Sequence, residues 1–169
     1  MGTARERILD AAEELITAGQ VPPALDAVAA AAGVSKGGLL YHFDKRSLLQ
    51  ALVTRALHRF DERLTAAATQ GTMAAAWLRL SVPAPGERAV YRAIMSMMRL
   101  TAGGEFDLPH EVGEAEQRWQ RMLAAELGDP VRARLVRLVG DGLFMAALTG
   151  PPPTSAEVEH LLDHLGLPS

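Results

Sequence analysis

The sequence contains no cysteine, and aromatic residues make up only 5% of its 169 residues. Without cysteine, neither a disulfide nor a thiolate metal site can form. No apolar run approaches the roughly 20 residues that a membrane-spanning helix needs. The first seven residues are largely polar and charged, unlike a secretory signal. We therefore expect a cytoplasmic protein without a membrane partner.

The sequence also lacks the usual components of an active site. It has no glycine-rich phosphate loop, no nucleophile elbow, and no carboxylate pair with a histidine on one helix face. His160 and His164 are four residues apart, a spacing that can bind zinc, but no third ligand accompanies them. We expect no enzymatic activity, no metal and no cofactor.

What the chain does contain is alanine and leucine, which dominate a hydrophobic fraction of 49% and favour helices. Apolar residues recur with helical spacing, and no alternating strand pattern interrupts them. The sequence therefore predicts an all-α protein of about nine helices. Glycine, proline and capping residues place these helices at about 3–19, 24–32, 36–42, 45–69, 72–82, 87–101, 111–127 and 130–148, with a last helix capped by Ser155.

The predicted helices divide into two parts. Residues 1–48 form a small three-helix head, and residues 49–169 form a helical body. The helix over 45–69 connects the two.

The head contains two short helices joined by a turn with Gly33, a pattern typical of a helix-turn-helix. Glycine allows a positive φ at this turn. Ala29 is small where the two helices cross, while Val34, Leu39 and Phe43 are spaced to fill the core of the head. The helix over 36–42 would then be the recognition helix in a DNA major groove.

The charge distribution agrees with this interpretation but does not decide it. Although the net charge is −3, residues 34–60 contain five Lys or Arg and one Asp. A local positive face on an acidic body is typical of a confined DNA-contact surface, but charge alone favours the alternative of an ordinary solvated helix face. We interpret Arg55 and Arg59, further along the connecting helix, as solvated surface.

Several side chains near the predicted turn can contact DNA. Lys36 can reach a guanine edge or a phosphate. Tyr41 and His42 each offer a donor to the DNA backbone, although Tyr41 can also lie partly in the core and His42 can be structural. A cation at the start of the next helix, Lys45 or Arg46, suits a phosphate.

Residues 33–43, GVSKGGLLYHF, followed by a charged cap and Leu48–Leu49, closely resemble the TetR family of bacterial regulators. The segment RILDAA at residues 7–12 also matches the usual opening of that family. The resemblance covers about residues 3–55. It implies a homodimer that binds a palindromic operator in double-stranded DNA and releases it when a small-molecule effector enters the C-terminal domain.

The resemblance also implies a set of DNA contacts. The sequence departs from the family pattern at Leu40, where many members have a phosphate-binding tyrosine, and at Ala24–Leu25, where a Ser or Thr is common. Both departures remove hydrogen bonds, so we expect weaker binding to the DNA backbone. The implied contacts are Ser35, Lys36, Gly37, Gly38, Leu40, Tyr41, His42 and Lys45.

Aromatic residues and methionines in the predicted body are candidates for an effector pocket. Methionine adapts to irregular shapes, and effector pockets are mostly apolar. The same residues can equally form ordinary core, and only the family resemblance favours a pocket. The candidates are Trp77, Tyr91, Met95, Met98, Arg99, Phe106, Trp119, Met122 and Phe144.

The last two predicted helices are candidates for a dimer interface. A two-fold dimer needs a self-complementary surface, and two helices per subunit can form a four-helix interface, as the family does. The candidate interface residues are Leu135, Leu138, Val139, Leu143, Ala146, Leu161, Leu162 and Leu165. The alternative to a DNA-binding regulator is a helical protein-interaction module without specific DNA binding.

Overall fold

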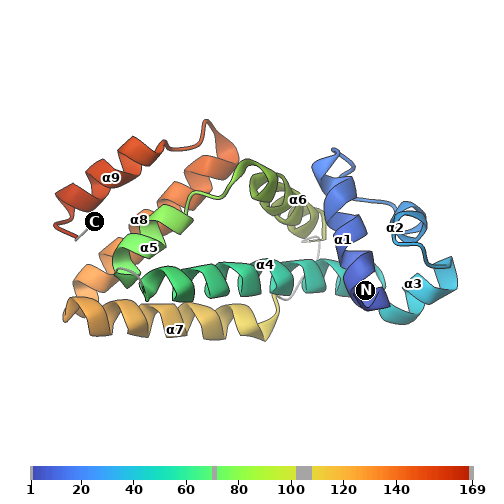
Figure 1. Ribbon diagram of the computed structural model, residues 1–169, viewed down its shortest axis with the longest axis horizontal. Coiled ribbons are helices and arrows are strands. Elements are labelled where there is room, and N and C mark those ends of the chain that lie inside the picture. The colour runs from blue at the N-terminus through green and yellow to red at the C-terminus, as the bar shows by residue number, and fades with distance from the viewer. Residues whose placement is uncertain (1, 70–71, 102–107, 168–169) are drawn as a thin grey trace. The chain divides into compact units, whose positions relative to one another are not determined.

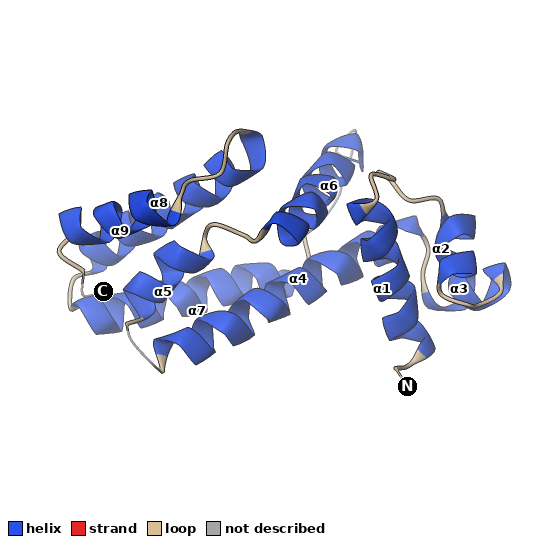
Figure 2. Cartoon of the chain, turned by 45° about the horizontal axis from the view of Figure 1, so that its top comes forward, coloured by secondary structure: helices blue, strands red, loops and turns tan. Residues whose placement is uncertain are grey.

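The computed structural model describes residues 2–69, 72–101 and 108–167 (Figure 1). Within these residues the chain forms α-helices and no strand (Figure 2). The all-α prediction is confirmed, and most predicted helix ends lie within two residues of the observed ones. The helices are α1 (Ala4–Thr17), α2 (Leu25–Ala31), α3 (Lys36–His42), α4 (Lys45–Ala68), α5 (Met73–Leu80), α6 (Pro85–Thr101), α7 (His110–Leu127), α8 (Pro130–Thr149) and α9 (Ser155–His164).

Local capping explains where several helices begin. At α1, the Thr3 hydroxyl accepts from the backbone N–H of Glu6 at 3.2 Å, and the Glu6 carboxylate accepts from the Thr3 N–H at 2.6 Å. At α4, the Asp44 carboxylate accepts from the Ser47 N–H at 2.7 Å. Hydrogen bonds from the side chain and backbone of Ser47 lower the pKa of Asp44.

Two predicted helix starts are wrong. Thr154, not Ser155, caps α9, because its hydroxyl and the Glu157 carboxylate form a reciprocal capping box. Helix α6 begins at Pro85 instead of Glu87. Proline is acceptable at the first helical position because its fixed φ suits a helix and no partner is needed for its missing N–H.

The chain folds into two compact units. The first comprises residues 1–56 and 85–109, and the second residues 57–84 and 110–169. Helix α4 contributes its first half to the first unit and its second half to the second. Helix α6 belongs to the same compact unit as α1–α3. The functional boundary near residue 48 stays a prediction.

The core of the first unit supports the predicted helix-turn-helix. Leu39 is fully buried, Phe43 is 3% exposed, and Val34 packs against the same cluster from the turn. Ala29 is also buried, as the close approach of α2 and α3 requires. The prediction that these side chains fill the core of the head is confirmed.

Arg55 is not the solvated surface residue that the sequence suggested. Its guanidinium forms an ion pair with Asp10 of α1, and its Nε lies 3.7 Å from the Glu13 carboxylate. The Arg55 side chain is only 29% exposed. The interaction therefore connects α4 to α1 within the first unit, a tertiary contact that helical spacing does not reveal.

Three aromatic side chains form the centre of the second unit. Phe60, Trp77 and Trp119 contact one another with ring centroids 5.1–5.6 Å apart. The Trp119 indole donates to the Asp61 carboxylate at 2.7 Å, and Arg118 donates to the same oxygen at 2.7 Å. This arrangement joins the second half of α4 to α7, which runs alongside it in both ribbon views (Figures 1 and 2).

Polar contacts also fix the other helices of the second unit. The Glu126 carboxylate accepts from the first N–H groups of α5, at Met73 and Ala74. Arg132 of α8 donates to the carbonyls of Leu165 and Gly166 at the end of α9, at 2.8 and 2.9 Å. Charged side chains thus satisfy the backbone groups that helix ends leave unpaired.

None of the helices in the described part of the chain combines the length and apolar character that crossing a bilayer requires. Within the same residues, no three His, Asp or Glu side chains are grouped so as to hold a metal ion.

Candidate nucleic-acid interface

The turn between α2 and α3 is closed by backbone hydrogen bonds. The Val34 N–H donates to the Ala29 carbonyl at 3.0 Å, and the Gly33 N–H donates to the Ala30 carbonyl at 3.2 Å. Gly33 adopts a φ of 65°, a backbone conformation that residues other than glycine rarely adopt. Ser35 then caps α3 by accepting from the Gly38 N–H at 3.0 Å. Short-range interactions therefore fix the direction of α3.

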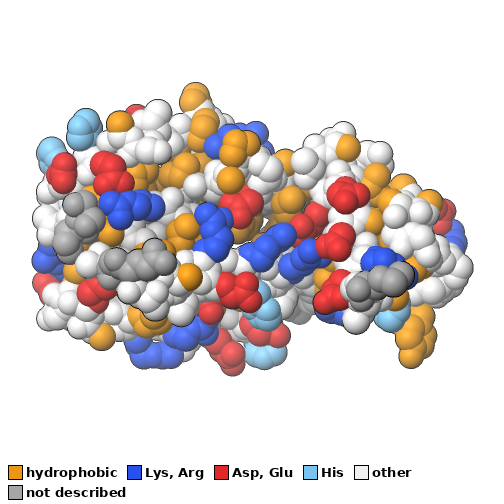
Figure 3. Space-filling model, viewed as in Figure 1, with side chains coloured by type: hydrophobic (Ala, Val, Ile, Leu, Met, Phe, Trp, Pro, Cys, Tyr) orange, Lys and Arg blue, Asp and Glu red, His pale blue; other side chains and the backbone are white. Residues whose placement is uncertain are grey.

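Helix α3 has one buried face and one exposed face. Leu39 holds the buried face, whereas Leu40 is 51% exposed and Tyr41 is 87% exposed. Hydrophobic side chains protrude over α3 on the face shown in Figure 3. This exposure excludes a core role for Tyr41, and large apolar side chains displayed together are typical of a surface that contacts a partner.

Lys36 lies at the first position of α3 and forms an ion pair with Asp26 of α2 at 3.0 Å. Both side chains are about two-thirds exposed (67% and 68%). An exposed ion pair of this kind contributes little to stability. The ammonium group of Lys36 therefore remains accessible to a DNA phosphate or base edge.

The remaining predicted DNA contacts lie around the same helix. A Cβ added to Gly37 would meet no atom within 4 Å, so packing does not require glycine there. Gly38 is half-buried beside Ser35, and His42 is exposed with its ring edge-on to Tyr41. The exposed residues are Ser35, Lys36, Gly37, Leu40, Tyr41 and His42, together with Lys45 at the start of α4.

Two arginines of α1 also hold the helix-turn-helix, and sequence reasoning missed both. The Arg5 guanidinium lies 5.2 Å from the centroid of the Phe43 ring. Arg7 donates from Nε to the Ala32 carbonyl at 3.3 Å, next to the turn. Both contacts depend on how α1 packs against distant residues, so no local pattern predicts them.

The predicted effector-pocket residues are divided between the two units. Trp77 and Trp119 are 4% and 7% exposed and pack in the core of the second unit. Met122 and Phe144 belong to the same unit, at 36% exposed and half-buried respectively. Tyr91, Met95 and Met98 are half-buried in the first unit, whereas Phe106 and the side chain of Arg99 lie outside the described residues. The pocket stays a prediction.

The predicted interface residues differ widely in exposure. Leu135 and Leu138 of α8 are 49% and 50% exposed, and Ala146 is also exposed. Leu143 and Leu162 are buried within the second unit, and Val139, Leu161 and Leu165 are half-buried against its core. Val131 and Met145, which the predicted interface does not include, are 77% and 45% exposed on the same helix. Their helical spacing from Leu135 and Leu138 places all four residues on one face of α8, and this spacing can be found in the sequence.

Comparison with known protein families identifies both halves of the chain. Residues 8–52 match the bacterial regulatory proteins of the tetR family, and residues 71–166 match the tetracyclin repressor-like C-terminal domain. The chain belongs to the TetR family. Members of this family are transcriptional regulators with an N-terminal DNA-binding domain, and they bind DNA operators as dimers.

Solved structures show the same fold as this TetR-family chain. A TetR-family member from Streptomyces coelicolor A3 is 24% identical with a TM-score of 0.66, and the match covers 99% of this chain and 100% of that one. A second protein, SCO7518 from Streptomyces coelicolor A3(2), is 21% identical with a TM-score of 0.61, and the match covers 96% of this chain and 98% of that one. NalD, the secondary repressor of the MexAB-OprM multidrug efflux pump in Pseudomonas aeruginosa, is 21% identical with a TM-score of 0.56, covering 96% and 95%.

No functionally curated protein matches the chain closely.

Proposed function

We propose that this TetR-family regulator is a homodimeric repressor that acts in the cytoplasm. In this proposal, the α3 helices of two subunits enter successive major grooves of a palindromic operator. A small apolar or amphipathic effector then releases the protein from the DNA. The similarity to NalD, a repressor, supports the direction of regulation.

The observation that carries this proposal is the exposed face of α3. Tyr41 is 87% exposed although it follows the fully buried Leu39 by only two residues. With Leu40 and the accessible Lys36 on the same short helix, it offers apolar contact area, a hydroxyl donor and a cation. These groups suit base edges and phosphates in a major groove.

The proposed dimer interface lies on α8. Val131, Leu135, Leu138 and Met145 occur at helical spacing, and all are at least 45% exposed. An apolar stripe along a long helix fits a second copy of the same stripe in a two-fold dimer. In a helix-turn-helix dimer, such an arrangement places two recognition helices about 34–36 Å apart, one turn of DNA.

The proposed effector site consists of those members of the predicted group that lie in the second unit. Trp77, Trp119 and Phe144 are its aromatic members among the described residues of the second unit. A coupling free energy of about 1–3 kcal/mol between effector binding and DNA binding is enough to release the protein from DNA.

The test is selection from random duplex DNA with the full-length protein, followed by sequencing. We expect an inverted repeat, and Lys36→Ala should abolish specific binding to it while leaving the helicity and the oligomeric state unchanged. Enrichment of no sequence would overturn the proposal.

The alternative, a helical interaction module without specific DNA binding, makes a different prediction. A DNA-binding protein loses affinity steeply as salt rises, because phosphate contacts release counterions. Binding of the selected duplex that does not change between low and moderate salt would favour the alternative.

A further inference from the structure

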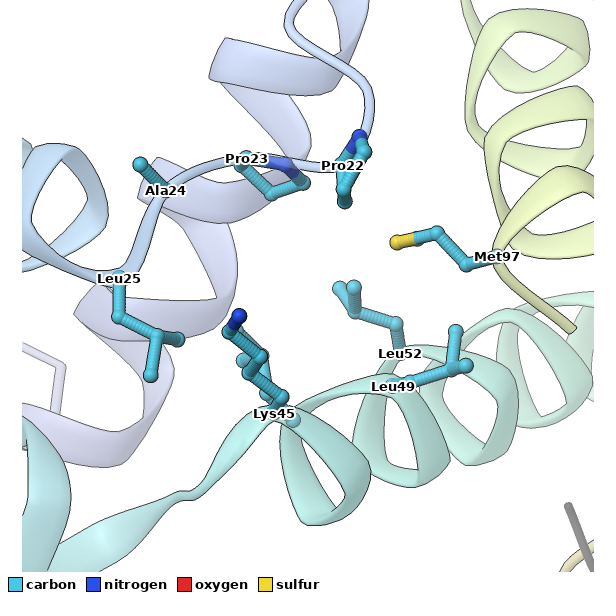
Figure 4. Close-up of a pocket in the computed structure, with 9 residues that line it drawn as sticks. Pro22, Pro23, Ala24, Leu25, Lys45, Leu49, Leu52 and Met97 are labelled. Carbon is cyan, nitrogen blue, oxygen red and sulfur yellow. The ribbon is translucent and has the colours of Figure 1, made fainter. Parts of the chain in front are cut away.

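A cavity of about 360 Å³ lies within the first compact unit, apart from the predicted effector pocket, with which it shares no residue (Figure 4). Its volume falls within the range of about 300–1,000 Å³ that is usual for small-molecule sites. The walls come from the connection between α1 and α2, the start of α2, the first two turns of α4, and α6. The lining residues are Pro22, Pro23, Ala24, Leu25, Lys45, Leu48, Leu49, Leu52 and Met97.

The lining combines one cation with otherwise apolar side chains. Leu48, Leu49 and Leu52 are at most 4% exposed and form an apolar floor along α4. In Figure 4, Met97 extends from α6 toward Pro22 on the opposite side. A cavity lined in this way favours a ligand with an aliphatic part, because transfer of such a part from water is favourable.

Lys45 gives the cavity its polarity. Its side chain rises from the start of α4, and its ammonium ends in the space beneath Pro23 (Figure 4). Among the residues that the structure describes, the Lys45 side chain has no partner in an ion pair or a hydrogen bond. The cation of a second lysine in the same unit, Lys36, is by contrast paired with Asp26. An unpaired cation beside an apolar cavity is complementary to an anion that carries an aliphatic chain.

We propose that this cavity binds an amphipathic carboxylate, with its aliphatic chain on the leucine floor and its carboxylate on the Lys45 ammonium. Lys45 is also one of the DNA contacts that the family resemblance implies. If the proposed function holds, a carboxylate on Lys45 removes that contact, so that the ligand lowers the affinity for DNA. Binding itself needs no DNA and is tested separately.

The first experiment measures binding to the full-length protein without DNA. Titration calorimetry with hexanoate, octanoate and decanoate, each below its micelle concentration, should show affinity rising with chain length. Each added methylene should tighten Kd about fourfold, as burial of a CH₂ group predicts. In parallel, the methyl NMR signal of Met97, assigned through Met97→Leu, should shift on titration. Absence of binding, or binding that leaves the Met97 signal unchanged, would overturn the proposal.

The second experiment tests the charge. Lys45→Gln should weaken octanoate binding by about fivefold, the upper limit for an exposed ion pair, while 1-octanol should bind it as it binds the wild type. Lys36→Gln removes the same charge from outside the cavity and should leave octanoate binding unchanged. Equal affinity of Lys45→Gln and the wild type for octanoate would overturn the assignment of the carboxylate to Lys45.

The last experiment connects the site to DNA. Octanoate at saturation should weaken binding of the selected duplex to the wild type, and should have a smaller effect on Lys45→Gln. If octanoate binds but the duplex affinity does not change, the cavity is a ligand site without the proposed regulatory role. If no duplex is selected at all, the proposed function fails while the calorimetric result for the cavity still stands.

Discussion

Gly140 shows how a single residue sets the spacing of two helices. A Cβ at this position would lie 2.1 Å from the Trp77 Nε1 atom and 2.7 Å from the Ser81 hydroxyl. Trp77 and Ser81 are both buried, and the Trp77 indole donates to the Arg137 carbonyl of α8. Neither side chain has free space to move into, so α8 can approach α5 only because residue 140 has no side chain.

We therefore expect Gly140→Ala to destabilise the protein by about 1–3 kcal/mol, the usual cost of overpacking. Thermal unfolding should report this as a fall in Tm of about 2–4 °C per kcal/mol. Gly113→Ala is the matched control, since a Cβ there meets no atom within 4 Å. It should raise stability by up to about 1 kcal/mol through helix propensity. Equal Tm values for the two variants would contradict the close approach at Gly140.

The ion pair between Lys36 and Asp26 gives a second prediction at a single residue. Asp26→Asn removes an acidic group from the proposed DNA-contact surface and leaves the Lys36 ammonium unpaired. DNA affinity should therefore increase by up to about fivefold, the upper limit for an exposed pair. Lys36→Ala should instead abolish specific binding to the operator, because it removes the cation itself. Fluorescence anisotropy of a labelled operator at several salt concentrations measures both.

A decrease in DNA affinity for Asp26→Asn would contradict this interpretation. It would mean that Asp26 orients Lys36 toward the DNA, so that the acid contributes to binding.

At the scale of helices, Asp61 connects α4 to α7 and makes the connection depend on pH. Burial raises the pKa of Asp61, but hydrogen bonds from Arg118 and Trp119 lower it more, so the pKa lies below its ordinary value of 3.8. The carboxylate therefore adds stability above that value, and this stability is lost as the pH falls through the pKa of the folded state.

Asp61→Asn should consequently reduce the free energy of unfolding at neutral pH by about 1–3 kcal/mol. The difference from the wild type should shrink as the pH drops below about 4. Asp141→Asn is a control for which the change in the free energy of unfolding should have the opposite sign. Burial raises the pKa of Asp141 and Glu116 raises it further, against the opposing effect of Arg137, so its charged form destabilises the fold at neutral pH. Urea unfolding over a pH series would distinguish the two, and parallel curves would contradict both assignments.

The sequence predicted the helices well because local signals define their ends. The capping box of Thr3 and Glu6, the Asp44 cap and Gly33 in the turn all act within a few residues. The same signal was available for α9, where Thr154 and Glu157 form a capping box that the prediction missed in favour of the neighbouring serine. Helix ends were thus wrong only where two candidate caps were adjacent or a proline began the helix.

Contacts between helices could not be predicted in the same way. Arg55 had the spacing of a solvated arginine, yet it pairs with Asp10 of α1. Trp77 and Trp119 were equally consistent with core or pocket, and the structure shows them packed on Phe60. The sequence predicted a DNA contact for Lys45. It did not predict the cavity beside Lys45, because three segments far apart in the sequence form its walls. Such features depend on tertiary packing, which helical periodicity does not encode.

For the whole molecule, the proposed mode of DNA recognition depends on two subunits, and the exposed stripe on α8 makes this dependence testable. Leu138 is 50% exposed in the single chain and lies at helical spacing from Val131, Leu135 and Met145. If this stripe pairs with its copy, Leu138→Glu places two like charges in an apolar interface. The buried charges would be unpaired, which is strongly unfavourable. The variant should therefore be monomeric at micromolar concentration while keeping its helicity.

Leu108→Glu is the matched control, because Leu108 is 48% exposed and belongs to the first compact unit, whereas α8 belongs to the second. Sedimentation velocity should show a monomer for Leu138→Glu and a dimer for Leu108→Glu and the wild type. Since a monomer contacts only one half-site, Leu138→Glu should also bind the full inverted repeat no more tightly than a single half-site. A dimeric Leu138→Glu protein with wild-type affinity for the repeat would exclude α8 as the centre of the interface, because an apolar seam cannot accommodate two glutamates without loss.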